Sequence, residues 1–458
     1  MRTYLEEYKS KLITAELAAA MVVSEDIVNY GGFNLKPVDF DKALGARAGE
    51  PGLEKVFIRL AGQVPPAPAV LTNDPEMKTF QVGSGFWSAQ DRYFGDRGIL
   101  DFFPLNYHDL NQMNYNEDRT PPSRKGRFWV AQVGSMDKHG NFNIGITNTD
   151  ARQECLHTPI SIVEINNTLP RCLGGWEESV HISEIDYIIE GSNTPLMSSG
   201  VIPDPSPAER RIAEQIVEEI SDGCCLQLGI GAMPNTIGLM IAASDLKDLG
   251  IQTEMFCPAM VDMYEAGKIT NAKKLNDKYK STYSFALGNQ TTYDFIDDNV
   301  RLASCPVEYV NAPQRILVQD KVISINNLVE IDLLTQACSE SNGLRHISGA
   351  GGQLDWVHGA FDSKGGKSFL AFTSTHTNKK GEVVSRIKPM LTPGAVVTVP
   401  RHSIHWVVTE YGKVQLKGLS VWERVEELVK LAHPDFRDEL MAEASKMGIW
   451  KRTNRKPL

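Results

Sequence analysis

A short apolar strand, a glycine turn and a proline-started helix follow one another twice in this chain. The pattern occurs at residues 25–37 and again at residues 221–234, where Gly229 and Gly231 stand in the turn. Proline suits the first turn of a helix, because its fixed φ is helical and its missing N–H is not needed there. The alternation of strands and helices predicts an α/β fold with a largely parallel sheet.

Three further segments repeat in the same order, which indicates a duplicated unit. Residues 55–60 match residues 251–256, residues 80–83 match residues 285–288, and residues 103–107 match residues 305–309. We therefore expect two similar open α/β domains with the active site in the cleft between them, where α/β proteins usually bind ligands. The position that matches Glu254 in the first copy falls near Arg59 and is not acidic, so one copy is expected to carry the chemistry.

A proline cluster at residues 203–207 is the best candidate for a linker between the two domains. The chain has 458 residues, which is too many for one ordinary core. We expect an N-terminal domain over residues 1–203 and a C-terminal domain over residues 204–458. Ser206 can cap the next helix, an amphipathic one that we expect Gly223 to end.

Composition and charge exclude several classes of function. The chain is 42% hydrophobic and 23% charged, and its formal net charge of -10 argues against a nucleic-acid binder. No apolar run is long enough to span a bilayer, and the charged N-terminus does not look like a secretory signal. Seven cysteines without a zinc spacing indicate reduced thiols in a cytoplasmic enzyme, and we expect no metal site.

The glycine turn at Gly229 and Gly231, followed by Glu254 on the next strand, is the main candidate site. Backbone N–H groups of such a turn can hold an anionic ligand, and an isolated acid can act as a nucleophile. The same spacing also fits a nicotinamide-dinucleotide site, although Pro234 stands where the third glycine would be. A purely structural turn, with Glu254 paired to an Arg or Lys, is a third interpretation.

Four other features each allow a functional and a structural interpretation. The turn with Gly349, Gly351 and Gly352 is either a tight turn or a donor of N–H groups to an oxyanion. Glu410 is a candidate acid or an ordinary strand end. Cys257 as a nucleophile would need a histidine base, and the sequence points to none. His402 and His405 are expected to be surface or partly buried histidines rather than metal ligands.

Six ordered motifs together resemble the acetyl-CoA hydrolase/transferase family, which includes 4-hydroxybutyrate CoA-transferase and butyryl-CoA:acetate CoA-transferase. The motifs are residues 226–235, 248–255, 347–355, 363–367, 408–412 and 432–437, and the resemblance covers nearly the whole chain. Residues 170–175 and 409–438 look closest to the butyryl-CoA:acetate branch.

The resemblance implies specific roles for the candidate residues. Glu254 is implied to be catalytic, forming a glutamyl-CoA thioester, with an oxyanion site at Gly351 and Gly352. The residues implied to bind CoA are Gly229, Ile230, Gly231, Ala232, Met233, Val329, Gly352 and Thr375. Lys364, Lys367 and Arg386 are candidate partners for the CoA phosphates.

The implied activity is transfer of CoA between a short-chain acyl-CoA, such as butyryl-CoA, and acetate. The implied partners are therefore acyl-CoA and short-chain carboxylates, with no cofactor beyond coenzyme A and with a homo-oligomeric assembly. Three alternatives remain open: a 4-hydroxybutyrate CoA-transferase, an acyl-CoA hydrolase on the same scaffold, and, from a different class, an NAD-linked oxidoreductase.

Overall fold

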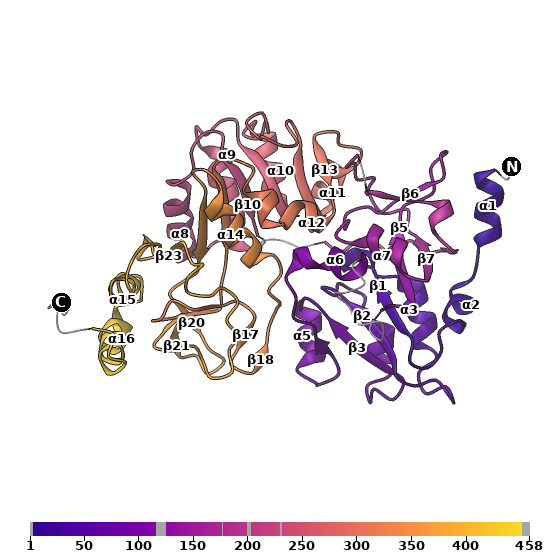
Figure 1. The fold of residues 1–458 in the computed structure, drawn as a ribbon, viewed down its shortest axis with the longest axis horizontal. Helices are drawn as coiled ribbons and strands as arrows, with labels where there is room; N and C mark the ends of the chain where they lie inside the picture. Colours follow the sequence, from indigo (N-terminus) through magenta and orange to yellow (C-terminus); the bar gives the residue numbers. More distant parts are fainter. Residues whose placement is uncertain (1–2, 116–124, 176, 199–202, 230, 451–458) are drawn as a thin grey trace. The chain divides into compact units, whose positions relative to one another are not determined.

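The structure, a computed structural model, describes residues 3–115, 125–175, 177–198, 203–229 and 231–450 (Figure 1). The chain divides into two compact units. The first unit comprises Met1–Gly200, Glu254–Phe256 and Ser281–Asn311, and the second comprises Val201–Thr253, Cys257–Lys280 and Ala312–Leu458. The domain boundary that the sequence predicts between residues 203 and 204 stays a prediction.

The N-terminal part of the chain forms a seven-stranded sheet in the order β4-β3-β2-β1-β5-β7-β9, with every neighbouring pair parallel. Its strands are β1 (Ile27–Tyr30), β2 (Val56–Leu60), β3 (Phe80–Ser84), β4 (Asp101–Phe102), β5 (Phe128–Val133), β7 (Ile160–Ile165) and β9 (Tyr187–Glu190). A separate antiparallel pair joins β6 (Asn141–Asn143) to β8 (Ser179–His181). All residues of β1 and β5 are buried, as expected where helices cover both faces of a parallel sheet.

Helices and short 3-10 turns connect these strands. They are α1 (Tyr4–Lys11), α2 (Ala15–Ala20), η1 (Phe33–Leu35), α3 (Val38–Gly45), α4 (Ala69–Thr72), α5 (Ala89–Gly95), η2 (Tyr107–Asp109), α6 (Leu110–Tyr115), α7 (Ala151–His157) and η4 (Ile182–Glu184). The side chain of Thr14 caps α2 by accepting a hydrogen bond from the backbone N–H of Leu17. The apolar core below the sheet includes Val28, Phe40 and Ile58.

The later strands form an eight-stranded sheet in the order β13-β12-β11-β10-β14-β19-β23-β24. They are β10 (Cys225–Leu228), β11 (Gly250–Phe256), β12 (Ser281–Ala286), β13 (Leu302–Ser304), β14 (Val322–Asn326), β19 (Lys367–Ala371), β23 (Trp406–Thr409) and β24 (Gly412–Gln415). Strands β10, β14, β19 and β23 run parallel to one another, and β24 is antiparallel to β23.

Shorter elements surround this sheet. The helices are α8 (Pro207–Val217), α9 (Ala232–Ala243), α10 (Pro258–Glu265), α11 (Gln290–Ile296), α12 (Val307–Asn311), α13 (Pro313–Ile316), α14 (Gln353–Asp362), α15 (Val421–Lys430) and α16 (Pro434–Lys446). The small strands are β15 (Glu330–Asp332), β16 (Ala337–Cys338), β17 (Ser341–Asn342), β18 (Arg345–His346), β20 (Thr375–Thr377), β21 (Val383–Ser385) and β22 (Ile387–Lys388). None of the helices in the described residues is both long and apolar enough to cross a membrane.

The two large sheets have the same strand order, which confirms the predicted duplication. Counting along each sheet, β4, β3, β2, β1, β5, β7 and β9 correspond to β13, β12, β11, β10, β14, β19 and β23. The segments at residues 55–60 and 251–256 therefore lie on the equivalent strands β2 and β11, and the segments at residues 103–107 and 305–309 follow the equivalent strands β4 and β13. Glu254 lies on β11, the counterpart of β2. The prediction of two similar open α/β sheets is confirmed.

Helix α8 begins as predicted but ends early. Ser206 forms a capping box with Glu209, and Pro207 is the first helical residue. The helix ends at Val217 rather than near Gly223. The backbone N–H groups of Glu219 and Ile220 bond to oxygens three residues back, in the tighter 3-10 pattern, so the α-helix does not continue. Gly223 instead adopts a φ of 75° in the turn that leads to β10.

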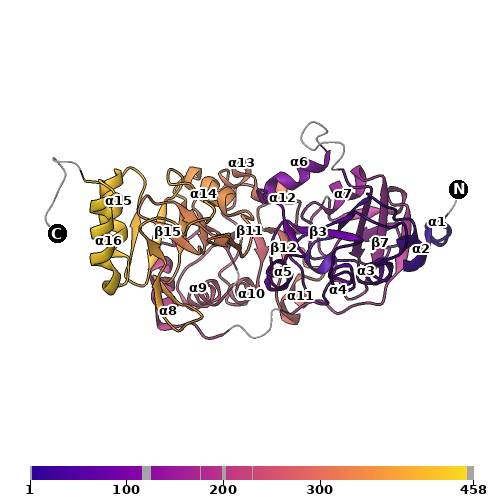
Figure 2. The same ribbon diagram turned by 90° about the horizontal axis from the view of Figure 1, so that it is seen from below.

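Helices α9 and α10 pack closely against each other through Gly238 (Figure 1, Figure 2). A Cβ atom added at Gly238 would lie 2.5 Å from the Cβ atom of Ala259, at the start of α10. The close approach of the two helices therefore depends on the small size of both residues.

We expect Gly238→Ala to destabilise the protein by about 1–3 kcal/mol, because overpacking forces the helices apart. The measurement is urea unfolding followed by circular dichroism. The double variant Gly238→Ala with Ala259→Gly is the matched control, and it should recover most of the loss. If Gly238→Ala alone leaves the stability unchanged, the close helix packing is wrong.

Candidate active site

Glu254 lies near the end of β11 among buried residues. Thr253 and Met255 on either side are buried, whereas Glu254 itself is half-buried. The predicted placement of a single carboxylate on a short strand between apolar neighbours is confirmed. A carboxylate on a strand end of this kind is a group that can act as a nucleophile toward a carbonyl carbon.

An asparagine that the sequence did not single out holds this carboxylate. The Asn311 side chain is fully buried at the end of α12, and its Nδ2 donates a 2.6 Å hydrogen bond to Glu254 Oε2. The donor is a neutral amide, so it fixes one carboxylate oxygen without adding a positive charge. The only sequence signal near it was the repeated segment at residues 305–309, which identified a strand end and not an amide.

Apolar and aromatic side chains gather beside Glu254 in the first unit. One cluster contains Tyr107, Met255, Phe285, Leu287 and Val307. The Phe33 ring extends this cluster by stacking on Phe285, with ring centroids 4.6 Å apart. Such surroundings limit access of water to groups near the carboxylate, a requirement for reactive acyl intermediates.

The predicted glycine turn between β10 and α9 is open. Gly231 is the N-cap of α9 with a φ of 123° and a ψ of 177°, a conformation available essentially to glycine alone. A Cβ atom added at Gly229 would meet nothing within 4 Å. Ala232 and Met233 form the first turn of α9, where unpaired N–H groups favour anions. Ile230 lies outside the described residues.

The equivalent turn of the first copy is filled by its own chain. A Cβ atom at Gly31 would lie 2.6 Å from the backbone oxygen of Leu35 and 2.7 Å from the side chain of Ala131. The two turns therefore share a sequence pattern but differ in space. This difference supports the prediction that one copy carries the ligand turn.

Several predicted CoA-binding residues share one edge of the second sheet. Because β10, β14 and β19 are parallel, the residues that follow them meet at the same edge. Gln227, just before Gly229, accepts a 3.3 Å hydrogen bond from Asn326 Nδ2 at the end of β14. Gln353, just after Gly352, donates a 2.7 Å bond to the backbone oxygen of Asn327.

Arg386 binds the loops at this edge together, and this corrects its expected role as a phosphate partner. Its guanidinium donates to the backbone oxygens of Leu328 and Val329 and, at 3.2 Å, to Thr373 Oγ1, close to Thr375. Burial lowers the pKa of Arg386 to about 10, and the negative charge of Glu410 partly offsets this. Four hydrogen bonds to the protein use its Nε, Nη1 and Nη2 atoms, so the guanidinium is held among these loops.

Lys364 and Lys367 lie at the opposite end of the strands, which also corrects the sequence expectation. Lys367 begins β19 level with Ile323, whereas Val329 follows the far end of β14. Its Nζ forms a 2.6 Å ion pair with Glu219. Strand direction rather than sequence spacing decides this separation.

The remaining candidates have structural partners. Gly351 has a φ of 53° and Gly352 is the N-cap of α14, so the predicted turn exists, while its oxyanion role stays a prediction. Glu410 accepts hydrogen bonds from the N–H and Oγ of Ser374, at 2.9 and 2.6 Å.

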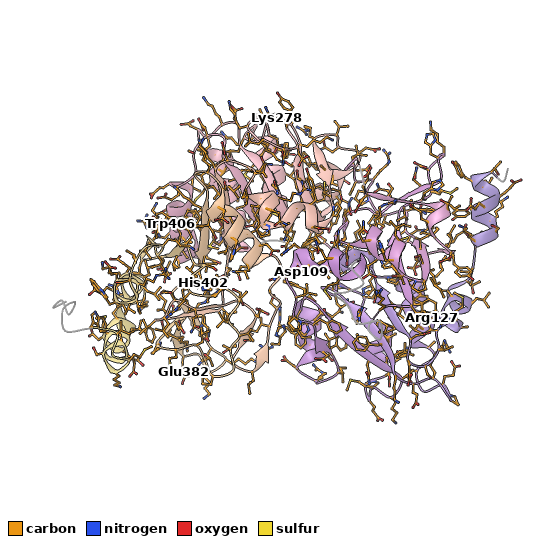
Figure 3. The ribbon with its side chains drawn as sticks, viewed as in Figure 1. Asp109, Arg127, Lys278, Glu382, His402 and Trp406 are labelled. Atoms are coloured by element: carbon orange, nitrogen blue, oxygen red, sulfur yellow. The ribbon has the colours of Figure 1, made fainter. Side chains whose placement is uncertain are left out.

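One of the two histidines, His402, matches the prediction of a surface side chain, whereas His405 is more buried than expected. His402 is exposed, and Figure 3 labels it together with Trp406 of β23. His405 is 7% exposed, and burial, together with the charges of Lys417 and Lys367, lowers its pKa to about 4. In the described part of the chain no three His, Cys, Asp or Glu side chains gather to hold a metal ion.

Two family profiles match the sequence. The acetyl-CoA hydrolase/transferase N-terminal domain matches residues 1–198, and the acetyl-CoA hydrolase/transferase C-terminal domain matches residues 288–444. The chain is 49% identical over 453 residues to the probable butyrate:acetyl-CoA coenzyme A-transferase of Syntrophomonas wolfei, covering 98% of each chain. It is 43% identical over 455 residues to the butyryl-CoA:acetate CoA-transferase of Anaerostipes caccae, covering 99% of this chain and all of the relative.

A solved structure shows the same fold. The crystal structure of RipA from Yersinia pestis has a TM-score of 0.87 and 34% sequence identity, covering 98% of this chain and 100% of that one. This protein therefore belongs to the acetyl-CoA hydrolase/transferase family. The resemblance seen in the six sequence motifs is confirmed.

Cys257, the alternative nucleophile close to Glu254, is buried at the N-cap of α10. Burial raises the pKa of its thiol to about 12, so roughly one molecule in ten thousand carries the thiolate at pH 8. We expect iodoacetamide at pH 8 to leave Cys257 of the native protein unmodified and the activity intact. Peptide mass spectrometry measures the labelling, with urea-unfolded protein as the positive control. Stoichiometric labelling of Cys257 with parallel loss of activity would contradict the assignment of Cys257 as a buried, unreactive thiol.

Proposed function

We propose that this protein transfers coenzyme A between a short-chain acyl-CoA, such as butyryl-CoA, and acetate, with Glu254 as the nucleophile. The observation that carries the proposal is the half-buried Glu254 carboxylate held by the Asn311 amide. The substrates follow the printed names of the two relatives described above. Family membership also favours the CoA interpretation of the Gly229 turn over the nicotinamide alternative.

The proposed reaction begins with attack of a Glu254 carboxylate oxygen on the thioester carbonyl carbon. The carbon–sulfur bond breaks, giving an acyl-glutamyl anhydride and CoA thiolate. The thiolate then attacks the glutamyl carbonyl carbon, releasing the carboxylate and leaving a glutamyl-CoA thioester. Acetate repeats both steps in reverse and departs as acetyl-CoA. The thioester energy is conserved at each step, so the reaction needs no cofactor beyond coenzyme A and no metal.

Asn311 prepares the carboxylate for this attack. Its amide donates to Oε2 and so holds the carboxylate in one orientation. A cation at this position would stabilise the ground-state carboxylate more strongly and weaken it as a nucleophile, whereas a neutral amide orients it at a smaller cost. The backbone N–H groups at Gly351 and Gly352 are proposed to stabilise the oxyanions, each donor contributing about 3–4 kcal/mol by analogy with known sites.

Coenzyme A is proposed to bind along the C-terminal edge of the second sheet. Gly229 and Gly231 leave room for a ligand, and Ala232 and Met233 offer the N-terminus of α9. Val329, Gly352 and Thr375 lie on loops that Arg386 and Gln353 tie to the same edge. We further propose that the enzyme works in the cytoplasm as a homo-oligomer, as the family resemblance implies.

We expect the covalent intermediate to be detectable on Glu254. Protein incubated with butyryl-CoA without acceptor should carry CoA on the peptide that contains Glu254, as seen by peptide mass spectrometry. Glu254→Gln should lack the adduct and lose activity by at least about a thousandfold, because an amide is a poor nucleophile.

Glu184→Gln is the matched control, since Glu184 is also half-buried and paired, there with Arg152 at 2.6 Å. It should keep both the adduct and the activity. An active Glu254→Gln variant together with no adduct on the unaltered protein would sink the proposed mechanism.

Acceptor dependence separates a transferase from a hydrolase, which the family description also covers. We expect butyryl-CoA to be consumed only when acetate is present, with one acetyl-CoA formed for each butyryl-CoA lost, as measured by liquid chromatography. Free CoA released at the same rate without acetate would instead establish a hydrolase. The same assay with 4-hydroxybutyryl-CoA as donor tests the third activity, and a higher kcat/KM than for butyryl-CoA would reassign the donor.

A further inference from the structure

Tyr107 is a buried tyrosine that the proposed reaction does not yet use. It begins η2, whose last residue, Asp109, is labelled in Figure 3. Its side chain is 7% exposed, and its ring meets Phe285 edge to face, with centroids 6.0 Å apart. Its hydroxyl forms a 2.8 Å hydrogen bond with Thr149 Oγ1. The ring and the hydroxyl are thus both fixed.

Thr149 connects this hydroxyl to the helix that carries Asn311. Its backbone oxygen accepts a 2.8 Å hydrogen bond from the N–H of Val307, the first residue of α12. A second contact holds α12 to the segment that follows Tyr107, because Gln112 of α6 donates a 2.9 Å hydrogen bond to Glu308 of α12. The position of α12, and with it the amide of Asn311, therefore depends on the segment that begins at Tyr107.

The negative charge of Glu254 acts on the phenol of Tyr107. Burial raises the pKa of the Tyr107 phenol well above its ordinary value, and the Glu254 carboxylate raises it further. The phenol therefore stays neutral, and its hydroxyl is a fixed dipole that feels the charge of the half-buried Glu254 carboxylate. A fixed dipole of this kind costs no reorganisation during a reaction.

We propose that Tyr107 is a positioning residue for the Glu254 nucleophile, holding α12 and Asn311 in place through Thr149 and keeping a polar group near the carboxylate. The inference rests on the proposed function of Glu254. It differs from a purely structural role, because the hydroxyl alone, without the ring, should alter the ionisation and reactivity of Glu254.

Other ionisable groups face this region from each packed element, and any pH effect must be separated from theirs. His108 and Asp109 lie on η2 and pair with each other at 3.5 Å. Asp150 precedes α7 and contributes to the raised pKa of Tyr107. Glu308 lies on α12 beside Gln112. Tyr107→Phe leaves all four unchanged, so a shift that it causes is assigned to the hydroxyl.

We expect Tyr107→Phe to lower kcat about tenfold, which corresponds to about 1.4 kcal/mol, with KM for butyryl-CoA within about twofold. Loss of a polar hydroxyl near a buried carboxylate disfavours the charged form and so raises the pKa of that carboxylate. The rising acid limb of the kcat/KM profile should therefore move to higher pH, by roughly half a unit to one unit. Steady-state kinetics over pH 4–8 measure both effects.

Thr149→Val is the second variant, and it should shift the acid limb in the same direction because it removes the partner of the Tyr107 hydroxyl. Tyr30→Phe is the matched control: Tyr30 is equally buried, and its hydroxyl bonds Asp41 at 3.3 Å. It should leave the acid limb where it is. The glutamyl-CoA adduct is measured on every variant in parallel.

Three results would decide the matter. No adduct on Glu254 of the unaltered protein defeats the proposed function itself. A normal adduct with an unshifted acid limb in Tyr107→Phe and Thr149→Val overturns the role of Tyr107 alone. An equal shift in Tyr30→Phe also overturns it, because the effect would then follow from lost stability. If Tyr107→Phe fails to fold, Thr149→Val gives the same decision.

Discussion

The hydrogen bond from Asn311 to Glu254 is the interaction on which the proposed chemistry of this protein depends. It joins a carboxylate on β11 to an amide at the end of α12, over a distance of 2.6 Å. Withdrawing a carboxylate from water is unfavourable, and a hydrogen bond to a charged group contributes about 1.5–3 kcal/mol against that loss. The bond therefore offsets part of the cost of holding the Glu254 carboxylate half-buried, and it fixes the orientation of that carboxylate.

The two large sheets share one strand order, but the packing around their equivalent glycine turns differs. In both copies the first strand leads to a glycine-containing turn. At Gly31 the turn is packed against Leu35 and Ala131, whereas at Gly229 it faces open space. The equivalent of Glu254 in the first copy is a strand residue of β2 that carries no acid. One architecture thus provides a filled turn that supports the fold and an open one suited to a ligand.

The sequence identified the duplicated strands and the helix caps correctly, and it placed Glu254 on its strand, but it placed the basic residues poorly. Ser206 capped its helix and Glu254 lay on its strand as predicted. Lys367 and Arg386 were expected beside the CoA phosphates because they are basic and near glycine turns. Lys367 lies at the end of β19 opposite to the glycine turns, and Arg386 is bonded to backbone oxygens of the protein. The spacing of residues along the chain does not show at which end of a sheet a side chain lies, or which group a cation binds.

The sequence by itself determined the duplicated α/β fold, the family and the acid that performs the proposed chemistry, because strand periodicity, glycine turns and caps are local properties. Only the tertiary structure decided what surrounds that acid. Asn311 is separated from Glu254 by 57 residues, and Tyr107 from Thr149 by 42. Such pairs form because parallel strands and their crossover helices bring distant segments together, and no local pattern encodes which amide or hydroxyl will arrive there.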